Sequence, residues 1–308
     1  MSAVCLIGGS GFLGSRVLQR AMHEKGQRLR VLAHRRTIQV ASGVAVLQGD
    51  ASDPRILDEL LVAEAVVLNL AYGGEHTGEQ LARVLAEACA RKGVRRLVHV
   101  STCSVYGRTP GREINEESAC DPVTPYERTK HAIEKILEAG ARGYELAVLR
   151  PTAIFGVGGR NFESLIGRVL RGGRPARYLR ACVMGRRRMN AVDVECVAAA
   201  VQWLASAPMM SPVERFIVSQ DDEPANDYAS VEAFFARRFG VAPYPFPALA
   251  LPPRLFSLVL GLAGRSVTDP ERRCSAAKLA SRGFRPPRTF QEALEEYAAS
   301  FTTADARP

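Results

Sequence analysis

A glycine-rich loop near the start of the chain restricts the possible folds more than any other feature. The sequence Gly-Gly-Ser-Gly-Phe-Leu-Gly at residues 8–14 follows an apolar run at 3–7 and opens a helical pattern at 11–25. Glycine lets a backbone approach a pyrophosphate closely, and a helix N-terminus offers free N–H groups. A plain turn is the competing interpretation, but the position between strand and helix favours a dinucleotide site. The residues predicted to form it are Gly8, Gly11, Phe12, Leu13 and Gly14.

Short apolar runs alternate with longer helical patterns through the first half of the chain. The predicted strands cover residues 3–7, 29–33, 44–47, 65–70, 96–101 and 146–149. The predicted helices at 11–25, 78–92 and 125–139 repeat apolar side chains at three- and four-residue spacing. This alternation predicts an α/β fold with a doubly wound parallel sheet and helices on both of its faces.

The pattern changes after Pro151. Glycine and arginine are frequent at 156–188, a helix and a strand are predicted at 194–205 and 215–219, and a last helix lies near 290–301. We expect a dinucleotide-binding domain at 1–155, which residues 190–219 rejoin. Residues 156–189 and 220–308 should form a smaller, mostly helical substrate-binding part. Both should face one cleft at the carboxyl ends of the strands.

His34, Arg35 and Arg36 follow the second predicted strand, where an NAD-specific fold usually places an acid on the ribose hydroxyls. The two guanidinium groups could instead bind a 2′-phosphate, although a solvated charge pair is the alternative. Asp50 and Ala51 follow the third predicted strand, and Asp50 could accept a hydrogen bond from adenine or cap the next helix. The sequence favours NADP as the cofactor, with NAD possible.

Thr102, Tyr126 and Lys130 form a candidate catalytic set. Tyrosine and lysine four residues apart share one helix face, so an ammonium can lie below a phenol. The usual pKa of a phenol is about 10, and a neighbouring cation lowers it. The lower pKa makes proton exchange with a substrate oxygen feasible. Thr102 could hold the same oxygen. This spacing is common by chance, and its combination with the glycine loop makes it specific.

The segments GGSGFLG, LVHVSTCSVYG, INEESACDPVTPYERTK, LRPTAIFG and AAKLASRGFRPPRTFQEAL resemble the extended short-chain dehydrogenase/reductase family over nearly the whole chain. The resemblance implies a Rossmann-like domain, a bound NAD or NADP, and Thr102, Tyr126 and Lys130 as the catalytic set. It also implies that Lys130 binds the nicotinamide ribose. The residues expected beside that ribose are Leu70, Ala71 and Tyr72, although their sequence departs from the family's usual one.

The same resemblance limits the reactions that this chain is expected to catalyse. Family dehydratases carry an Asp-Glu pair where this chain has Cys103 and Ser104, and family epimerases carry an acid after the second strand, which is absent here. We therefore expect a reductase in which NADPH delivers hydride to a ketone, with Ser104 beside Thr102 and Tyr126 on the substrate. Relatives place basic residues on a substrate diphosphate, which here would be Arg186, Arg187 and Arg188. A nucleotide-linked 4-keto-6-deoxy sugar is the expected substrate, and a solvated arginine loop is the alternative.

Three other functions stay open. A nucleotide-sugar epimerase is the runner-up among enzymes. An apolar segment at 249–263 resembles those of relatives that reduce sterol-like or phenolic ketones, although an amphipathic core helix also explains it. A non-catalytic, cofactor-sensing regulator is less favoured because the chain retains Thr102, Tyr126 and Lys130.

Other partners and cofactors find little support in the sequence. The seven cysteines and five histidines do not cluster, so we expect no metal site and a reducing compartment. The opening residues lack a signal peptide's basic region and no apolar run is long enough to cross a membrane, so a cytoplasmic enzyme without membrane contact is expected. The net charge of +9 comes from scattered arginines and predicts no nucleic-acid partner.

A homodimer is expected through residues 78–92 and 125–139. The apolar stripes predicted to form its interface are Leu81, Val84, Leu85, Cys89, Ile133, Ile136 and Leu137.

Overall fold

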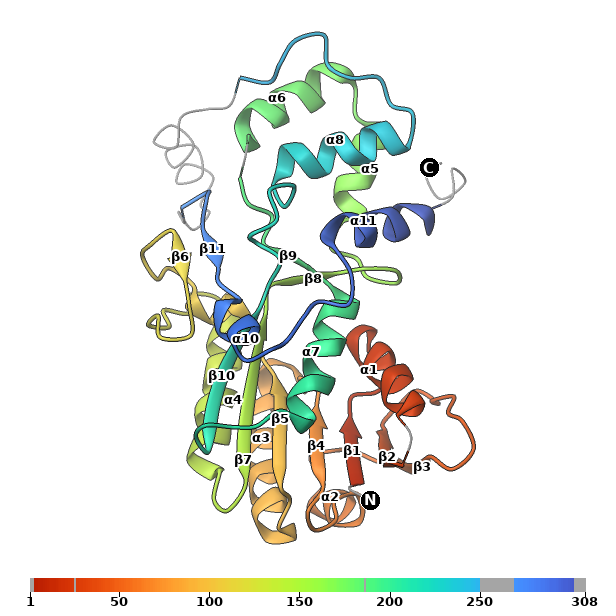
Figure 1. Ribbon diagram of the computed structural model, residues 1–308, viewed down its shortest axis with the longest axis vertical. Helices are drawn as coiled ribbons and strands as arrows, with labels where there is room; N and C mark the ends of the chain where they lie inside the picture. Colours follow the sequence, from red (N-terminus) through yellow and green to blue (C-terminus); the bar gives the residue numbers. More distant parts are fainter. Residues whose placement is uncertain (1–2, 25, 186, 250–268, 302–308) are drawn as a thin grey trace.

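A seven-stranded parallel sheet lies at the centre of the larger part of the molecule (Figure 1). In the computed structural model, which describes residues 3–24, 26–185, 187–249 and 269–301, the strand order is β10-β7-β5-β4-β1-β2-β3. The chain leaves β1 toward β2 and β3 and then returns to β4 on the other side of β1. The strands are β1 (Ala3–Ile7), β2 (Arg28–Ala33), β3 (Ala45–Gln48), β4 (Val66–Asn69), β5 (Arg96–Val100), β7 (Glu145–Pro151) and β10 (Val213–Val218).

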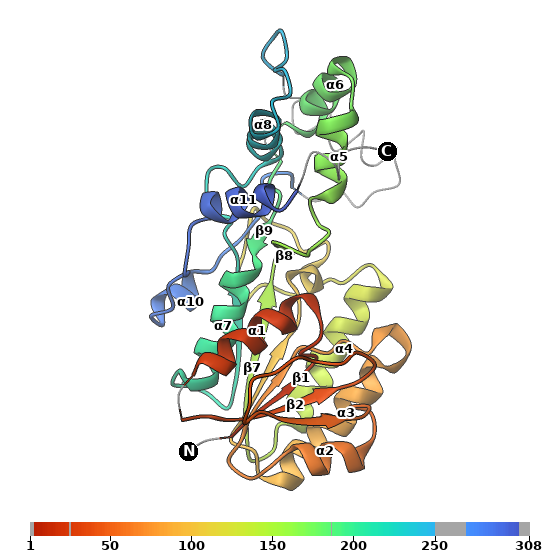
Figure 2. The same cartoon turned by 90° about the vertical axis from the view of Figure 1, so that its right-hand side faces the viewer.

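Helices cover both faces of this sheet (Figure 2). On one face, α1 (Phe12–His23) and α7 (Val194–Ser206) bury an aliphatic core that includes Leu6, Val31 and Val98. On the other face lie α2 (Pro54–Leu60), α3 (Gly74–Lys92) and α4 (Pro125–Gly140), over a second core. The doubly wound, Rossmann-like fold is confirmed, and the order of strands reverses between β1 and β4, where such folds bind ligands.

The sequence located these strands to within two residues, but it placed the start of α3 too late. We predicted that this helix begins at Gly78, whereas it begins at Gly74. Its first turn carries Glu75, His76 and Thr77, which are polar and exposed and so give no apolar periodicity. A left-handed turn at Gly73 and Gly74, with φ of 75° and 86°, starts the helix instead.

The second part of the molecule packs mainly around aromatic rings. The stretch 156–188, which the sequence described only by its glycines and arginines, forms two helices that lie with α8 and α11 above a two-stranded parallel sheet (Figure 1). Phe155, Phe162, Phe235, Phe290 and Tyr297 fill the core between them. The elements are β8 (Ala153–Phe155), β9 (Ala191–Asp193), α5 (Glu163–Arg171), α6 (Arg174–Met184), α8 (Tyr228–Arg238) and α11 (Phe290–Ala299).

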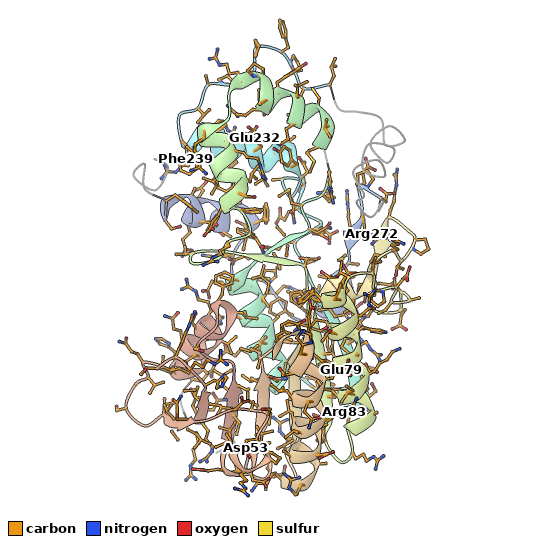
Figure 3. All side chains as sticks on the ribbon, turned by 180° about the vertical axis from the view of Figure 1, so that it is seen from behind. Asp53, Glu79, Arg83, Glu232, Phe239 and Arg272 are labelled. Atoms are coloured by element: carbon orange, nitrogen blue, oxygen red, sulfur yellow. The ribbon has the colours of Figure 1, made fainter. Side chains whose placement is uncertain are left out.

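Smaller elements join the two parts. The strands β6 (Glu113–Ile114) and β11 (Arg273–Cys274) pair in parallel, although they are far apart in the sequence. A short 3-10 helix, η1 (Cys103–Tyr106), follows β5, and α10 (Ala277–Ser281) follows β11. Arg272, labelled in Figure 3, donates to the carbonyl oxygen of Gly107 at 2.8 Å and so holds the β11 segment against the chain after η1.

The apolar stripes that we predicted to form a dimer interface serve the chain's own core. All of those side chains except Ile136 are buried between α3, α4 and the sheet. The outer face of α3 carries the exposed Glu79 and Arg83, which pair with each other (Figure 3). The residue-level argument for a homodimer is therefore wrong, because α3 and α4 use these stripes to pack on each other. Among the described residues, no helix is both long and apolar enough to cross a membrane.

Candidate cofactor and catalytic site

The glycine loop between β1 and α1 is shaped by close backbone contacts. A Cβ atom on Gly8 would lie 2.8 Å from the amide nitrogen of Ala71, and one on Gly14 would lie 2.0 Å from the carbonyl oxygen of Gly8. Gly11 is the N-cap of α1 and offers no side chain to the first-turn N–H groups. Gly8 and Gly14 are thus required for packing, while Gly11 leaves the helix N-terminus open to an anion.

A pocket of about 540 Å³ lies against this loop. It brings together eight of the predicted cofactor residues: Gly8, Gly11, His34, Arg35, Asp50, Ala51, Leu70 and Ala71. The sequence missed several others that line it, namely Ile7, Ser10, Leu32, Ser52, Gly73, Thr77 and Leu81. Ser10 and Ser52 could have been predicted from the sequence, because Ser10 is adjacent to Gly11 and Ser52 is adjacent to Ala51. The fit of the loop and the pocket to a dinucleotide supports the predicted cofactor class.

Six predicted cofactor residues lie outside this lining: Phe12, Leu13, Gly14, Arg36, Tyr72 and Lys130. The ring of Phe12 lies against Gly159 in the second part, where a Cβ would approach it to 2.6 Å. Phe12 and Leu13 could therefore contribute to anion binding only through the backbone N–H groups of the first helical turn. Arg36 is exposed beside Arg35.

Asp50 lies at the end of β3 facing His34, with 3.4 Å between Oδ2 and Nε2. Its carboxylate accepts hydrogen bonds from the backbone N–H and the hydroxyl of Ser52, both at 2.8 Å. The backbone hydrogen bond is the main cause of the lowered pKa of Asp50. The alternative that Asp50 caps the next helix is wrong, because Asp53 is the N-cap of α2 and accepts from the N–H of Arg55.

Tyr126 and Lys130 lie one turn apart on α4, next to Thr102. The helix begins with a capping box between Thr124 and Glu127, which fixes the first turn that carries Tyr126. Thr102 is the N-cap of η1, and its side chain lies close enough to Tyr126 to act on the pKa of that phenol. The structure thus brings the predicted catalytic set together at the carboxyl end of β5.

Lys130 is almost fully buried, and its Nζ donates to the carbonyl oxygen of Val100 at 3.2 Å. Burial lowers the pKa of Lys130 to about 8, which the charge of Glu134 partly opposes. Burial also raises the pKa of Tyr126, and the side chain of Thr102 opposes that rise. The predicted lowering of the Tyr126 pKa by Lys130 is therefore wrong in its direction, because desolvation of the phenolate is the larger effect.

A buried polar pair beneath this set escaped the sequence analysis. The side-chain amide nitrogen of Asn69 in β4 lies 3.1 Å from Nδ1 of His99 in β5, and the two residues are in register. Burial, with the charge of Lys130 second, holds the pKa of His99 well below its usual value. The signal that could have revealed the pair is that both polar residues occupy the same position near the ends of neighbouring apolar strands.

The predicted diphosphate site is only partly described. Arg186 lies outside the described residues, as does the apolar segment 250–263. Arg187 is half-buried, and its backbone N–H donates to Met184. The guanidinium group of Arg188 donates to the carbonyl oxygen of Glu223 at 2.9 Å, so it holds the loop before α8. Ser104 is exposed beside Thr102, with 3.2 Å between the hydroxyl oxygens.

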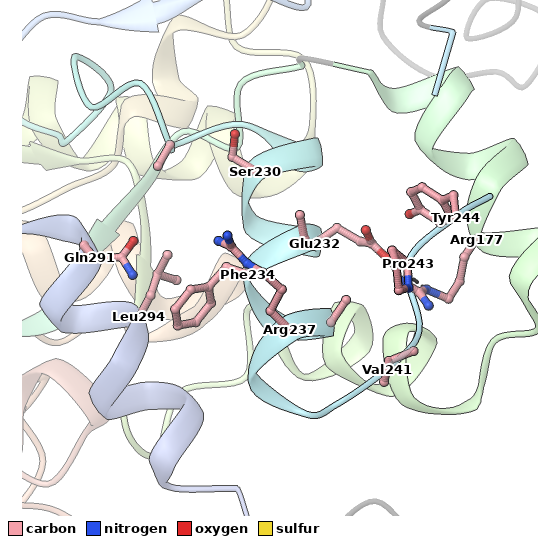
Figure 4. A pocket seen from close by; sticks show the side chains of 13 residues that line it. Arg177, Ser230, Glu232, Phe234, Arg237, Val241, Pro243, Tyr244, Gln291 and Leu294 are labelled. Carbon is pink, nitrogen blue, oxygen red and sulfur yellow. Dashed lines mark hydrogen bonds and ion pairs between the residues drawn. The ribbon is translucent and has the colours of Figure 1, made fainter. Parts of the chain in front are cut away.

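The second part contains a pocket of about 620 Å³ (Figure 4). Arg177 in α6 forms a buried ion pair with Glu232 in α8 at 2.6 Å, and the ring of Tyr244 lies against the guanidinium group. Gln291 and Leu294 of α11 line the opposite side of α8 (Figure 4). The ion pair joins α6 to α8 and so has a structural role. Within the described ranges, no group of side chains could hold a metal ion.

The similarity to known proteins extends over both parts of the chain. Residues 4–218 match the model of the NAD dependent epimerase/dehydratase family. Sterol demethylase protein B of Methylococcus capsulatus is 31% identical over 267 residues, which cover 80% of this chain and 77% of that protein. A UDP-glucose 4-epimerase of Azospirillum brasilense is 30% identical over 168 residues, which cover 48% of this chain and 47% of that protein.

A solved structure supports the same assignment at the level of the fold. The UDP-glucose 4-epimerase of Thermus thermophilus in complex with NAD has a TM-score of 0.70 and 22% identity, covering 97% of this chain and 98% of that one. Its match includes the sheet and the second part alike. The family model covers the glycine loop, Thr102, Tyr126 and Lys130. The chain therefore belongs to the NAD dependent epimerase/dehydratase family.

Proposed function

We propose that the protein is an NAD(P)-dependent oxidoreductase that interconverts a ketone and a secondary alcohol. The observation that carries the proposal is the convergence of Thr102, Tyr126 and Lys130 next to a pocket suited to a dinucleotide. A bound nicotinamide supplies the hydride in reduction and accepts it in oxidation.

The chain's own residues handle the proton and the substrate oxygen. In reduction, the hydroxyl of Tyr126 donates its proton to the carbonyl oxygen while the carbonyl carbon gains hydride. The hydroxyl of Thr102 hydrogen-bonds the same oxygen, with Ser104 beside it, and Lys130 holds the nicotinamide ribose. The ordinary pKa of a phenol is about 10 and desolvation raises that of Tyr126 further, so its hydroxyl carries the proton needed for reduction at neutral pH.

The preferred cofactor is NADP. Arg35 lines the pocket at the end of β2 and Arg36 is exposed beside it, so two guanidinium groups are available for a 2′-phosphate. No acid follows β2, and Asp50 after β3, which lines the same pocket, is the proposed partner of the adenine amino group. The open N-terminus of α1 suits the pyrophosphate.

An apolar, sterol-like ketone is the substrate class that we favour. The similarity to sterol demethylase protein B covers 80% of the chain, whereas the similarity to the Azospirillum epimerase covers 48%. In addition, the guanidinium group of Arg188 already binds a backbone carbonyl, which weakens the predicted diphosphate site.

A nucleotide-linked 4-keto-6-deoxy sugar is the second candidate, with epimerisation as a related reaction. Arg187 is half-buried in the segment between α6 and β9, where the family resemblance places basic residues on a substrate diphosphate. The epimerase relative supports the same class.

The test is a screen of both substrate classes in the presence of NADP. Thermal stabilisation by a 3-ketosteroid, followed by its turnover with NADPH, is the expected result. Stabilisation by UDP or dTDP alone, with turnover of a keto-sugar, would move the enzyme to the second candidate. Tight NADPH binding without turnover of either class would contradict the enzyme proposal and favour a cofactor-sensing regulator.

A further inference from the structure

Tyr72 lies against both Lys130 and Tyr126. The ammonium nitrogen of Lys130 lies over its ring, 4.9 Å from the centroid. The ring of Tyr126 meets it edge to face, with 5.3 Å between centroids and 73° between planes. One aromatic side chain thus contacts both members of the pair on α4, although it comes from the loop between β4 and α3.

The backbone around Tyr72 fixes where its ring lies. The side-chain oxygen of Asn69 accepts the N–H of Ala71 at 3.1 Å, which closes a turn directly before Tyr72. After it, the chain reverses through Gly73, and a Cβ on Gly78 would lie 2.8 Å from the carbonyl oxygen of Tyr72. This close approach holds the loop against the first turns of α3.

Few groups compete for the Lys130 ammonium. From β5, the Val100 carbonyl accepts its hydrogen bond and His99 lies nearby with a pKa held low by burial. On α4 itself, Glu134 is engaged by the two nitrogens of Arg150 that lie at 3.1 and 2.5 Å. Burial, with the charge of Glu75 second, raises the pKa of Tyr72, so its ring is a neutral phenol rather than a counter-ion.

We propose that Tyr72 is a positioning residue for the Tyr126 and Lys130 pair, acting through the face of its ring. This rests on the proposed function, in which that pair transfers the proton and holds the cofactor. An aromatic face attracts a desolvated ammonium, and an edge-to-face contact restricts the orientation of the neighbouring ring. The ring, rather than the hydroxyl, carries the effect.

The substitution Tyr72→Leu removes the ring while keeping an apolar side chain. A desolvated ammonium then loses a favourable contact, so we expect the pKa of Lys130 to fall by about one unit. Tyr126 gains rotational freedom, and kcat should fall about tenfold or more, with a smaller change in the substrate KM. Tyr72→Phe keeps the ring, so in this variant the pKa of Lys130 should match that of the parent protein.

The first experiment needs no turnover. Trace acetylation of Lys130 with acetic anhydride, quantified by mass spectrometry of its peptide from pH 6 to 10, reports its titration in the ligand-free protein. Tyr72→Phe should titrate like the parent, and Tyr72→Leu and Tyr72→Met about one unit lower. Circular dichroism tests whether each variant is folded. If Tyr72→Leu is unfolded, Tyr72→Met takes its place in the comparison.

The outcomes separate this proposal from the proposed function. A Tyr72→Leu protein that titrates like the parent would overturn the role of the ring. A Tyr72→Phe protein that behaves like Tyr72→Leu would transfer the effect to the hydroxyl and also overturn it. If the titration shifts as expected but no ketone is reduced, the positioning of Lys130 is supported and the proposed reaction is what fails.

Discussion

Tyr126 illustrates how burial and hydrogen bonding set the role of a single side chain. Desolvation raises the pKa of its phenol, the side chain of Thr102 opposes that rise, and the hydroxyl carries its proton at neutral pH. Tyr126→Phe removes the hydroxyl and leaves the ring, so we expect hydride transfer to fall by about a hundredfold or more. Cofactor binding, followed by nicotinamide fluorescence, should stay near the parental affinity. Near-parental turnover on the true substrate would contradict the proposed proton donor.

Arg35 and Arg36 are the residues on which cofactor choice depends. The double substitution Arg35→Ala with Arg36→Ala removes both guanidinium groups from the end of β2. Because each charge-assisted hydrogen bond contributes about 1.5–3 kcal/mol, NADPH affinity should fall about tenfold or more. NADH affinity serves as the control and should change little. Equal affinities of the parent protein for NADPH and NADH would show that the arginines do not select the cofactor.

Sequence reasoning performs well for residues whose role depends on spacing and poorly for those whose role depends on contacts. The spacing of Tyr126 and Lys130 predicts that they share one face of a helix, and they lie one turn apart on α4. The direction of the Tyr126 pKa shift depends on burial, which the spacing does not reveal. Likewise, the spacing does not reveal that the guanidinium group of Arg188 donates to the carbonyl oxygen of Glu223, and its role on a substrate stays a prediction.

At the scale of the elements, a buried ion pair joins α4 to β7. Arg150 lies 2.5 Å from Glu134, both side chains are at most 3% exposed, and Arg150 also donates to the hydroxyl of Tyr106 in η1. The pair thus joins three elements around the candidate catalytic set. The sequence does not predict this ion pair, because an arginine in a strand and a glutamate in a helix give no sign that they will be buried together.

Arg150→Met should destabilise the protein by about 3–5 kcal/mol, because it leaves the carboxylate of Glu134 buried without a partner. The free energy of unfolding in urea measures this loss. The matched control is Arg91→Met, since Arg91 pairs with Asp58 at 2.7 Å on the surface, with side chains 48% and 43% exposed. That change should cost about 0–1 kcal/mol. Similar losses in the two variants would contradict the structural role of the buried pair.

At the scale of the whole molecule, the homodimer stays a prediction on a changed basis. The outer side of α3 and α4 forms a groove that Ala90, Ile136 and Ala139 line, between charged side chains. If a second copy packs there, Ile136→Asp should convert the dimer to a monomer while cofactor affinity is retained. Light scattering that gives about 33.5 kDa for the parent protein at micromolar concentration would refute the dimer.

Asp221 lies where the two parts of the molecule meet. Its carboxylate is fully buried and accepts hydrogen bonds from the side chain of Asn190 before β9 and from the N–H of Cys274 in β11, both at 2.7 Å. The side-chain amide of Asn226 adds a third, at 3.3 Å. Asn190 has a positive φ of 46°, a conformation that few residue types tolerate. These contacts join segments that are up to 84 residues apart by sequence number, which no local pattern could predict.

The pH dependence of stability should reveal this junction. Burial raises the pKa of Asp221 from 3.8 to about 6, so the folded state binds more protons than the unfolded state between these values. Stability from this group is therefore fully present below about pH 4 and is lost as pH rises through about 6. The loss amounts to about 3 kcal/mol at most. Urea unfolding at pH 4, 5, 6 and 7 should show a shallower decline in Asp221→Asn than in the parent. Asp222→Asn is the control at the exposed neighbour, and it should keep most of the parental slope because the charge of Asp222 is the smallest contribution to the raised pKa. Identical slopes in all three proteins would mean that the ionisation of Asp221 does not couple to folding, and that the polar junction stabilises the molecule equally in both charge states.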